Sequence, residues 1–355
     1  MKTSKGPKLI VVPWLEGGGA QGALEGILRQ LGKENVRLVV LFRGSRNHES
    51  TMELAEFVTE LECRRNPLGV LQASRRIQPF LGSSGAIYSL MRASHLVLGL
   101  VPRQLVVNKR LAATFHQLPS QDSSTILGKL EDVLVKRGVR FAGLITTPSS
   151  RAIDELIKGG FGTINNTRLE HNLIHVSSSP AVPPREGRIR ELRLVFAGRI
   201  TRQKGLDRIP KLLKAATTPV HLVCLGDGEK REELELMSKH VGSLHKVEVL
   251  PYVTDIEPYL DWSDAVVMPS RWELNPLVVW EARARGRGTI ASDIDVFRDL
   301  SGSGPIWTFH NESAFASVLE KLATDPTERT RAFNLALESF KQLSTRSSIV
   351  EYLDV

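Results

Sequence analysis

Residues 268–288 read MPSRWELNPLVVWEARARGRG. The stretch begins at the end of an apolar run, Ala265–Met268, that predicts a short buried strand. Asn275 is a good helix N-cap and Pro276 suits the first helical position, so we expect a helix from Pro276 to the residue before Gly286. The first N–H groups of a helix have no partner within it, and the helix dipole favours an anion there. The stretch therefore predicts an anion site where a strand gives way to a helix.

Two glutamates flank this predicted site. Glu273 lies in the loop before the helix, and Glu281 lies within the helix. Carboxylates at these two places can accept hydrogen bonds from hydroxyl groups on either side of a diphosphate. A helical glutamate is usually solvated, but residues 277–280 are Leu-Val-Val-Trp, which predicts a largely buried helix. Because an unpaired buried carboxylate is costly, a ligand or a partner is favoured for Glu281.

Short apolar strands alternate with helix-compatible segments on both sides of this stretch. The predicted strands are residues 8–13, 36–42, 94–101, 110–115, 141–146, 192–197, 221–225, 247–250 and 265–268. Helices are expected near residues 24–31, 206–216, 230–240, 256–262 and 276–285. This alternation is typical of α/β folds with parallel sheets.

A segment rich in serine and proline divides the chain. The 355 residues exceed the usual size of one core, so two domains are expected. Residues 177–184 read SSSPAVPP, which suits neither a strand interior nor a helix. We therefore expect an N-terminal Rossmann-like domain over residues 1–180 and a C-terminal one over residues 190–340.

Composition excludes several classes of protein. The chain is 41% hydrophobic and 24% charged, as in globular enzymes, so neither wholesale disorder nor a fibrous repeat is indicated. Cys63 and Cys224 are the only cysteines and lie far apart, so neither a zinc site nor a disulfide is expected. There is no apolar run of about eighteen residues, and residues 1–7 are polar, so we expect a cytoplasmic protein.

Positive charge is concentrated in the first half. Residues 1–180 hold 23 Lys and Arg against 14 Asp and Glu, whereas the remainder holds 24 against 25. A basic domain attracts an anionic membrane surface, a phosphorylated acceptor or nucleic acid through the same long-range field. A solvated face without a partner is the plain alternative.

Three motifs around the opening stretch resemble family 4 glycosyltransferases. Glu273 and Glu281 match the E-x7-E signature of that family. Residues 196–205, FAGRITRQKG, resemble its G-R-x4-K-G segment, and residues 225–228, LGDG, resemble its strand-ending G-D-G turn. Their order along residues 192–295 follows the family pattern. Unlike the other two motifs, the G-D-G turn is interpreted as structural, because glycines after a strand mostly allow backbone conformations that other residues do not adopt.

The resemblance implies a GT-B fold, in which two Rossmann-like domains face each other across a cleft. The first domain would bind the acceptor and the second a nucleotide sugar. Residues 341–355 would return to the first domain. The reaction implied is retaining transfer of a hexose without a metal or cofactor.

The resemblance also assigns roles in the second half. Arg199 and Lys204 would neutralise the two phosphates, although such residues are ordinarily surface residues. Glu281 would accept hydrogen bonds from the ribose, and Glu273, a catalytic candidate, would hold the transferred sugar. The further donor-binding candidates are Tyr252 and Val253 near the base, and Asn275, Pro276 and Leu277 at the helix start.

Two features of the first half resemble the family more weakly. Gly18 and Gly19 follow the first strand as the family's glycine loop does, and would let the backbone approach the donor phosphate. A plain flexible turn is the alternative. His116, at the end of residues 113–116 (ATFH), resembles a strand-end histidine near the transferred sugar and is the second catalytic candidate. A core or surface histidine is the alternative.

One departure from the family leaves the donor sugar open. Many members have Gly-Phe-Gly after the first glutamate, where this chain has Leu274, Asn275 and Pro276. Proline has no N–H, so one expected donor to the sugar or phosphate is missing.

The predicted reaction therefore moves a hexose from a nucleoside diphosphate sugar to a glycan or lipid-linked acceptor in polysaccharide or glycoconjugate biosynthesis. A UDP-sugar is favoured and a GDP-sugar comes next. The excess positive charge fits a peripheral enzyme at the inner face of an anionic membrane. A sugar-nucleotide epimerase on the same fold is the alternative, while no aromatic-rich basic strand supports nucleic-acid binding.

Overall fold

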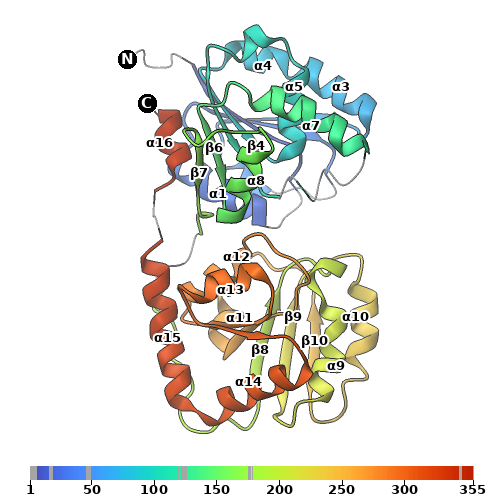
Figure 1. The fold of residues 1–355 in the computed structure, drawn as a ribbon, viewed down its shortest axis with the longest axis vertical. Coiled ribbons are helices and arrows are strands. Elements are labelled where there is room, and N and C mark those ends of the chain that lie inside the picture. Colours follow the sequence, from blue (N-terminus) through green and yellow to red (C-terminus); the bar gives the residue numbers. More distant parts are fainter. Residues whose placement is uncertain are drawn as a thin grey trace. The chain divides into compact units, whose positions relative to one another are not determined.

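The computed structural model describes residues 6–15, 19–44, 49–117, 120, 126–174, 177, 179–343 and 346–354. Gly18 lies outside them. The chain forms two compact units, residues 1–173 with 344–355 and residues 174–343. Each unit is built on one parallel sheet with helices packed against it (Figure 1).

Seven parallel strands form the sheet of the first unit, in the order β3-β2-β1-β4-β5-β6-β7. They are β1 (Lys8–Val12), β2 (Val36–Phe42), β3 (Phe57–Cys63), β4 (Ala86–Leu90), β5 (Arg110–Thr114), β6 (Leu144–Thr147) and β7 (Thr167–Leu169). The central strands are continuous apolar runs because helices cover both of their faces. Chain order reverses between β1 and β4, so the first unit has a topological switch point there.

Helices cover the first sheet on both sides. They are α1 (Gly19–Leu31), α2 (Glu49–Met52), α3 (Pro67–Arg76), α4 (Gln78–Ser83), α5 (Arg92–Leu100), the 3-10 turn η1 (Arg103–Leu105), α7 (Ile126–Val139), α8 (Ser150–Lys158) and α16 (Ser348–Asp354). One core cluster joins the sheet to α3, α5 and α7 through Ala73, Val97 and Val135. The opposite cluster joins it to α1 and α16 through Leu24 and Ile349, so the C-terminal helix packs in the first unit.

The predicted strand at residues 94–101 is wrong. This segment lies in helix α5, and the strand is β4, directly before it. Residues 94–99 are all buried, so the helix has no polar face to reveal a helical period. Its neighbour α7 packs unusually close, since a Cβ on Gly99 would lie 2.0 Å from the Leu134 carbonyl oxygen.

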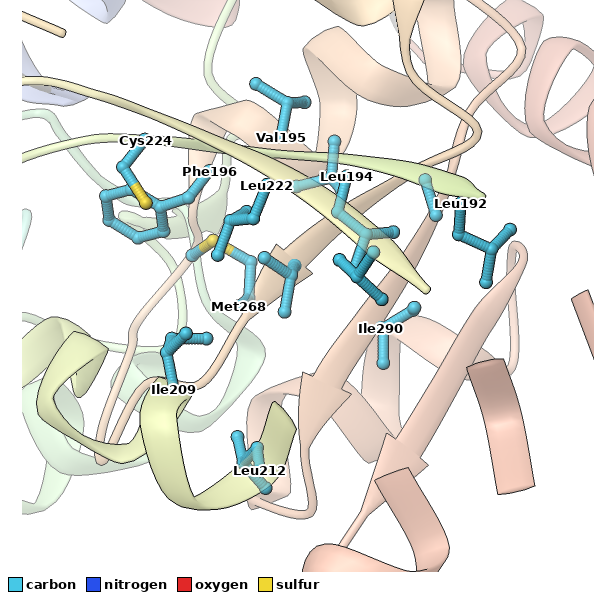
Figure 2. Close-up of a cluster of buried hydrophobic side chains, with 14 of the residues drawn as sticks. Leu192, Leu194, Val195, Phe196, Ile209, Leu212, Leu222, Cys224, Met268 and Ile290 are labelled. Atoms are coloured by element: carbon cyan, nitrogen blue, oxygen red, sulfur yellow. The ribbon is translucent and has the colours of Figure 1, made fainter. Parts of the chain in front are cut away.

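Six parallel strands form the sheet of the second unit, in the order β10-β9-β8-β11-β12-β13. They are β8 (Leu192–Ala197), β9 (Val220–Leu225), β10 (Lys246–Leu250), β11 (Ala265–Met268), β12 (Gly288–Ser292) and β13 (Ile306–Phe309). Figure 2 shows part of the core, where Ile209 and Leu212 of a helix lie with strand residues such as Leu222 and Ile290. Chain order reverses between β8 and β11, and ligands of open α/β sheets bind at such switch points.

The helical segments of the second unit alternate with its strands. They are η2 (Arg202–Lys204), η3 (Leu206–Arg208), α9 (Ile209–Lys214), α10 (Arg231–Ser238), α11 (Glu257–Trp262), α12 (Leu277–Ala284), α13 (Asp295–Ser301), α14 (Glu312–Thr324) and α15 (Pro326–Lys341). None of the helices in the described ranges is long and apolar enough to cross a membrane.

Buried arginines attach the proline-rich segment to the second unit. Arg285 donates hydrogen bonds to the carbonyl oxygens of Ser179 and Pro180, at 2.8 and 3.0 Å. Arg287 donates to the carbonyl oxygen of Val182 at 2.8 Å. Both guanidinium groups are almost fully buried. The described part of this segment is therefore fixed to the unit that follows it.

Candidate functional site

Lys204 and Glu273 meet where the loops after β8 and β11 flank the switch point. The Lys204 ammonium donates to Oε1 of Glu273 at 2.6 Å, and Ser270 Oγ donates to the same oxygen at 2.9 Å. The side chain of Glu273 is only 6% exposed and that of Lys204 15% exposed. Two residues predicted for different parts of the donor thus form a largely buried ion pair.

Gly205 lets the two loops approach each other. It has a left-handed backbone with φ of 69°, and a Cβ there would lie 2.2 Å from the carbonyl oxygen of Pro269. Beside this contact Arg271 donates to both carboxylate oxygens of Asp207, at 2.7 and 2.6 Å. That pairing lowers the pKa of Asp207. Because glycine and the ion pair fix the backbone on both sides, Lys204 and Glu273 are held in place.

Arg199 is a cation that the described residues leave unpaired beside this ion pair. Its side chain is exposed and makes no hydrogen bond or ion pair with any other residue in the described ranges. It lies on the same loop as Lys204, after the left-handed Gly198. An unpaired guanidinium at a switch point can bind a phosphate with two parallel hydrogen bonds.

The G-D-G turn brings the loop after β9 against the loop after β8. Gly226 and Gly228 have φ of 146° and 157°, and Cβ atoms there would lie 2.0 Å and 2.4 Å from the carbonyl oxygens of Gly198 and Ile200. No other residue fits these approaches, which confirms the structural interpretation of the two glycines. Asp227 between them accepts a hydrogen bond from the Tyr252 N–H at 3.1 Å.

Tyr252 and Val253 follow β10, the edge strand two places from β8. The Tyr252 side chain is exposed, and Val253 is half-buried against the core of the second unit. Their backbone is tied to the G-D-G turn through Asp227. Contact with a nucleobase stays a prediction for both residues.

Asn275 is not the N-cap of α12, so that prediction is wrong. The helix begins at Leu277, and Pro276 occupies the cap position without a side-chain hydrogen bond. The Asn275 side-chain oxygen instead accepts from the Trp280 indole N–H at 2.7 Å. A buried indole needs an acceptor, and Asn275 supplies it. Gly286 follows the helix with φ of 68°, consistent with the predicted stop.

The start of α12 still presents backbone donors. The first N–H groups of an α-helix have no acceptor within the helix, and here they belong to Leu277 and Val278, since the Val279 N–H donates to the Pro276 carbonyl oxygen at 3.2 Å. Pro276 has no N–H and is buried with extended backbone, so it shapes the entry to the helix without donating.

Glu281 is a carboxylate that the described part of the chain leaves unpaired. Its side chain makes no hydrogen bond or ion pair there. Burial, followed by the nearby charge of Glu257, raises the pKa of its carboxyl from 4.5 to about 7. A group that alternates between protonated and ionised forms near neutral pH suits a hydroxyl-binding role, because a bound hydroxyl would favour the ionised form.

In the first unit His116 follows β5 and is buried at its ring. Its Nε2 has no hydrogen-bond partner in the described residues, and burial lowers the pKa of the ring to about 4. The histidine is therefore neutral at physiological pH. Gly19 is the first residue of α1 and is exposed, while its predicted partner Gly18 lies outside the described residues.

His95 is a second buried histidine, which the sequence did not single out. Its two ring nitrogens contact Ser89 Oγ at 2.8 Å and the Thr114 carbonyl oxygen at 3.1 Å. Burial lowers its pKa to about 3. Because both nitrogens are satisfied, His95 is a core residue, and the unsatisfied His116 is the better functional candidate of the two.

The described residues do not group three or more His, Cys, Asp or Glu side chains as a metal site would require. Cys63 and Cys224 are both free and buried. Burial raises the pKa of the Cys224 thiol to about 12, so it is inert at neutral pH.

Comparison with known proteins finds a family similar to the second unit. Residues 185–337 match the family model for glycosyl transferases group 1. The lipopolysaccharide core biosynthesis glycosyltransferase LpsD of Rhizobium meliloti is 26% identical over 174 residues, which are 46% of this chain and 48% of that protein. The D-inositol 3-phosphate glycosyltransferase of Xylanimonas cellulosilytica is 30% identical over 172 residues, 46% of this chain and 41% of that protein. The chain thus spans about half or less of these two relatives.

Comparison of structures covers the whole chain. The crystal structure of Alr3699/HepE from Anabaena in complex with UDP and glucose superposes with a TM-score of 0.79 at 16% identity, over 98% of this chain and 97% of that one. At this identity the match establishes the fold. The two parallel α/β units have the GT-B architecture.

Proposed function

We propose that the chain is a metal-independent, retaining glycosyltransferase. It would move a hexose from a nucleoside diphosphate sugar to a glycan or lipid-linked acceptor in polysaccharide or glycoconjugate biosynthesis. A UDP-sugar is the favoured donor and a GDP-sugar the next. The family match over residues 185–337 supports this proposal. So do the similarity to LpsD, a glycosyltransferase of lipopolysaccharide core biosynthesis, and the similarity to HepE, whose structure contains UDP and glucose.

One observation carries this proposal. At the switch point of the second sheet, Arg199 has no partner among the described residues, Lys204 is paired to Glu273, and these cations lie on one loop. Glu281 adds an unpaired, largely buried carboxylate on α12. Cations suit a diphosphate and carboxylates suit sugar hydroxyls, so together they match a nucleotide sugar better than either part alone.

In the proposed mechanism the bond between the anomeric carbon and the diphosphate oxygen breaks. Arg199, Lys204 and the N–H groups at the start of α12 stabilise the negative charge that develops on the leaving diphosphate. A new bond forms from the acceptor oxygen to the same face of the anomeric carbon, and the acceptor proton passes to the leaving diphosphate. Glu273 positions the sugar through its hydroxyl groups and forms no covalent bond to it.

The proposal is tested first by ligand stabilisation. Thermal melting is measured with UDP, GDP and ADP, each with and without EDTA. A ligand present at 100 times its Kd stabilises the folded state by about 2.7 kcal/mol, so the correct base gives a clear shift. We expect UDP to give the largest shift and EDTA to leave it unchanged. No shift with any of the three nucleotides would overturn the donor site.

Product analysis tests the reaction. With donor alone, an epimerase would convert the sugar nucleotide, whereas a transferase would leave its sugar unchanged. With donor and acceptor, the anomeric configuration of the product tests retention. His116→Ala tests the proposed contribution of the first unit, and we expect it to lower turnover while UDP binding persists.

The proposed cellular site is the cytoplasmic side of a membrane, with peripheral attachment. The excess of Lys and Arg over Asp and Glu in residues 1–180 supports this part of the proposal. Such attachment would bring the enzyme to a lipid-linked acceptor.

A further inference from the structure

A long stretch of the first unit carries positive charge without acids. Between Glu62 and Asp122 there are eight Lys and Arg and no Asp or Glu. The stretch includes α3, α4 and α5, which cover one face of the first sheet. The excess charge of the first half therefore has a definite location in the fold.

Helices α3, α5 and α7 form one layer on that face. Helix α5 contacts both α3 and α7, and all three contribute to the same core cluster (Figure 1). Residues 94–99 of α5 are buried between its neighbours. The exposed sides of α3 and α7 therefore face away from the same side of the sheet.

The two outer helices carry the same exposed pattern. On α3, Leu68 and Leu71 are 77% and 46% exposed, and Arg75 follows them. On α7, Leu130 and Val133 are 63% and 64% exposed, and Arg137 follows them. In each helix the spacing is i, i+3 and i+7, which places two apolar side chains and an arginine on one stripe. We call these six residues the paired stripes.

The two acids of α7 are partly offset, because one arginine contacts both of them. Arg92 contacts Asp132 at 2.7 Å and Glu131 at 3.9 Å, and those are the acids of α7. Helix α8, which joins the same core cluster, balances Asp154 and Glu155 with Arg151 and Lys158.

Basic residues within and next to the paired stripes lack acidic partners in the described part of the chain. Arg75 and Arg137 have no ion pair among the described residues, and neither has Lys129, which is exposed next to Leu130. An approaching anionic surface therefore meets uncompensated positive charge. The four apolar side chains need a second explanation, because charge alone does not favour their exposure.

We propose that the paired stripes dock the first unit onto an anionic lipid bilayer. Leucine and valine side chains would enter the boundary between headgroups and acyl chains, while the arginines contact lipid phosphates. The phosphates of a nucleic acid could contact the arginines, but its backbone has no apolar surface for the exposed leucines. A bilayer explains both kinds of residue.

Flotation with vesicles tests this inference. The intact protein is mixed with vesicles of phosphatidylglycerol and phosphatidylcholine, or of phosphatidylcholine alone, at low and high salt. We expect flotation with the anionic vesicles that weakens at high salt, since added ions screen the attraction. Flotation with neutral vesicles to the same extent, or with neither, would overturn the proposal.

Two double variants separate charge from apolar contact. R75Q/R137Q should weaken partitioning roughly 25-fold, because each basic residue near an anionic surface contributes about fivefold. L68Q/L130Q should weaken it by roughly tenfold or more through lost apolar burial. The matched control R29Q/K33Q removes two exposed charges at α1, on the opposite face of the sheet, and should change partitioning by less than about twofold.

The outcomes exclude the rival partners. A nucleic-acid site would lose affinity in R75Q/R137Q but not in L68Q/L130Q, and that result would refute membrane docking. Equal effects of R75Q/R137Q and the α1 control would show a nonspecific charge effect and would also refute it. Melting curves confirm that each variant is folded. UDP binding tests the second unit. If the intact protein binds UDP but does not float with anionic vesicles, the membrane-docking inference is wrong and the proposed function is unaffected.

Discussion

At Glu281, burial disfavours the charged form of the side chain. The pKa of its carboxyl is raised to about 7, chiefly by burial, from an ordinary value of 4.5. Between these values the folded chain keeps a proton that the unfolded chain has lost, so stability falls as pH rises from 4.5 to 7. Above pH 7 the carboxylate is ionised in both states, and its burial lowers the free energy of unfolding by a constant amount, on the order of 3 kcal/mol. A nucleotide that hydrogen-bonds to the carboxylate would recover part of it.

Glu281→Gln removes this pH dependence. In urea unfolding without nucleotide, we expect the variant to exceed the wild type in stability by about 2–3 kcal/mol at pH 8 and to match it near pH 4.5. UDP should bind the variant roughly tenfold more weakly, because a charged hydrogen bond is lost. If the variant is less stable than the wild type at pH 8, Glu281 has a partner that stabilises its charge, and the proposed ligand role is wrong.

Glu273 is expected to act through the transferred sugar. For Glu273→Gln we expect kcat/KM to fall by about 100-fold or more, because contacts strengthened in the transition state are worth that much. UDP affinity should change by less than about threefold, since UDP lacks the sugar. Both are measured by steady-state kinetics and by titration with UDP.

A control is needed because Glu273→Gln also breaks the ion pair with Lys204. Glu233→Gln breaks an exposed pair with Lys230 on α10 and should leave turnover unchanged. Turnover of Glu273→Gln within about threefold of the wild type would exclude the positioning role.

Among the elements, the loop after β8 depends on one glycine. Gly205 and Gly187 both have positive φ, 69° and 63°, but only Gly205 has a close neighbour, the Pro269 carbonyl oxygen. Gly187→Ala adds only backbone strain, on the order of 1 kcal/mol, which lowers Tm by about 2–4 °C. Gly205→Ala would also displace the Pro269 carbonyl group. We therefore expect it to lower Tm at least twice as much as Gly187→Ala does, and to weaken UDP binding. Equal Tm values for the two variants would show that the loops do not depend on this contact.

Apolar runs bounded by turn signals were predictable where they form strands, whereas a buried apolar run that forms a helix was not. Strands β8 to β11 and helices α9 to α12 follow from apolar runs between turn signals, and their predicted ranges agree with the structure to within a few residues. No ranges were predicted for the later strands and helices of the second unit. The segment at residues 94–101 failed because α5 is buried on all sides. The Asn275 cap failed because the indole of Trp280, five residues along the chain, donates to the same oxygen. Residue preferences do not show that α5 is covered by its neighbours, or which donor the Asn275 oxygen accepts from.

The site was predictable as far as motifs reach. Placing Lys204 and Glu273 on the loops after two strands follows from sequence, but their direct ion pair depends on strand order, which puts β8 beside β11. The buried arginines at Arg285 and Arg287 resemble surface residues in the sequence. Their burial depends on carbonyl groups more than 100 positions away.

At the scale of the whole molecule, the chain divides into two compact units, and we expect them to have separate stabilities. Residues 344–355 return to the first unit, where Ile349 and Leu353 are almost fully buried. Ser347 and Ser348 donate to the Glu170 carboxylate there, so the last helix is fixed by polar as well as apolar contacts. Mutation of this helix should therefore affect a unit from which the proposed nucleotide site is absent.

Ile349→Ala tests this separation. Truncation of a buried isoleucine costs about 2–5 kcal/mol, so the first unit should unfold at lower urea and be cleaved faster by protease. UDP affinity should stay within about twofold, because the residues proposed to bind it lie in the other core. Leu319→Ala, in the core of the second unit, is the matched control and should give the reverse pattern, with cleavage of residues 174–343 suppressed by UDP. If either variant destabilises both units equally, the two cores unfold as one, and UDP bound to the second would then protect the membrane-docking unit as well.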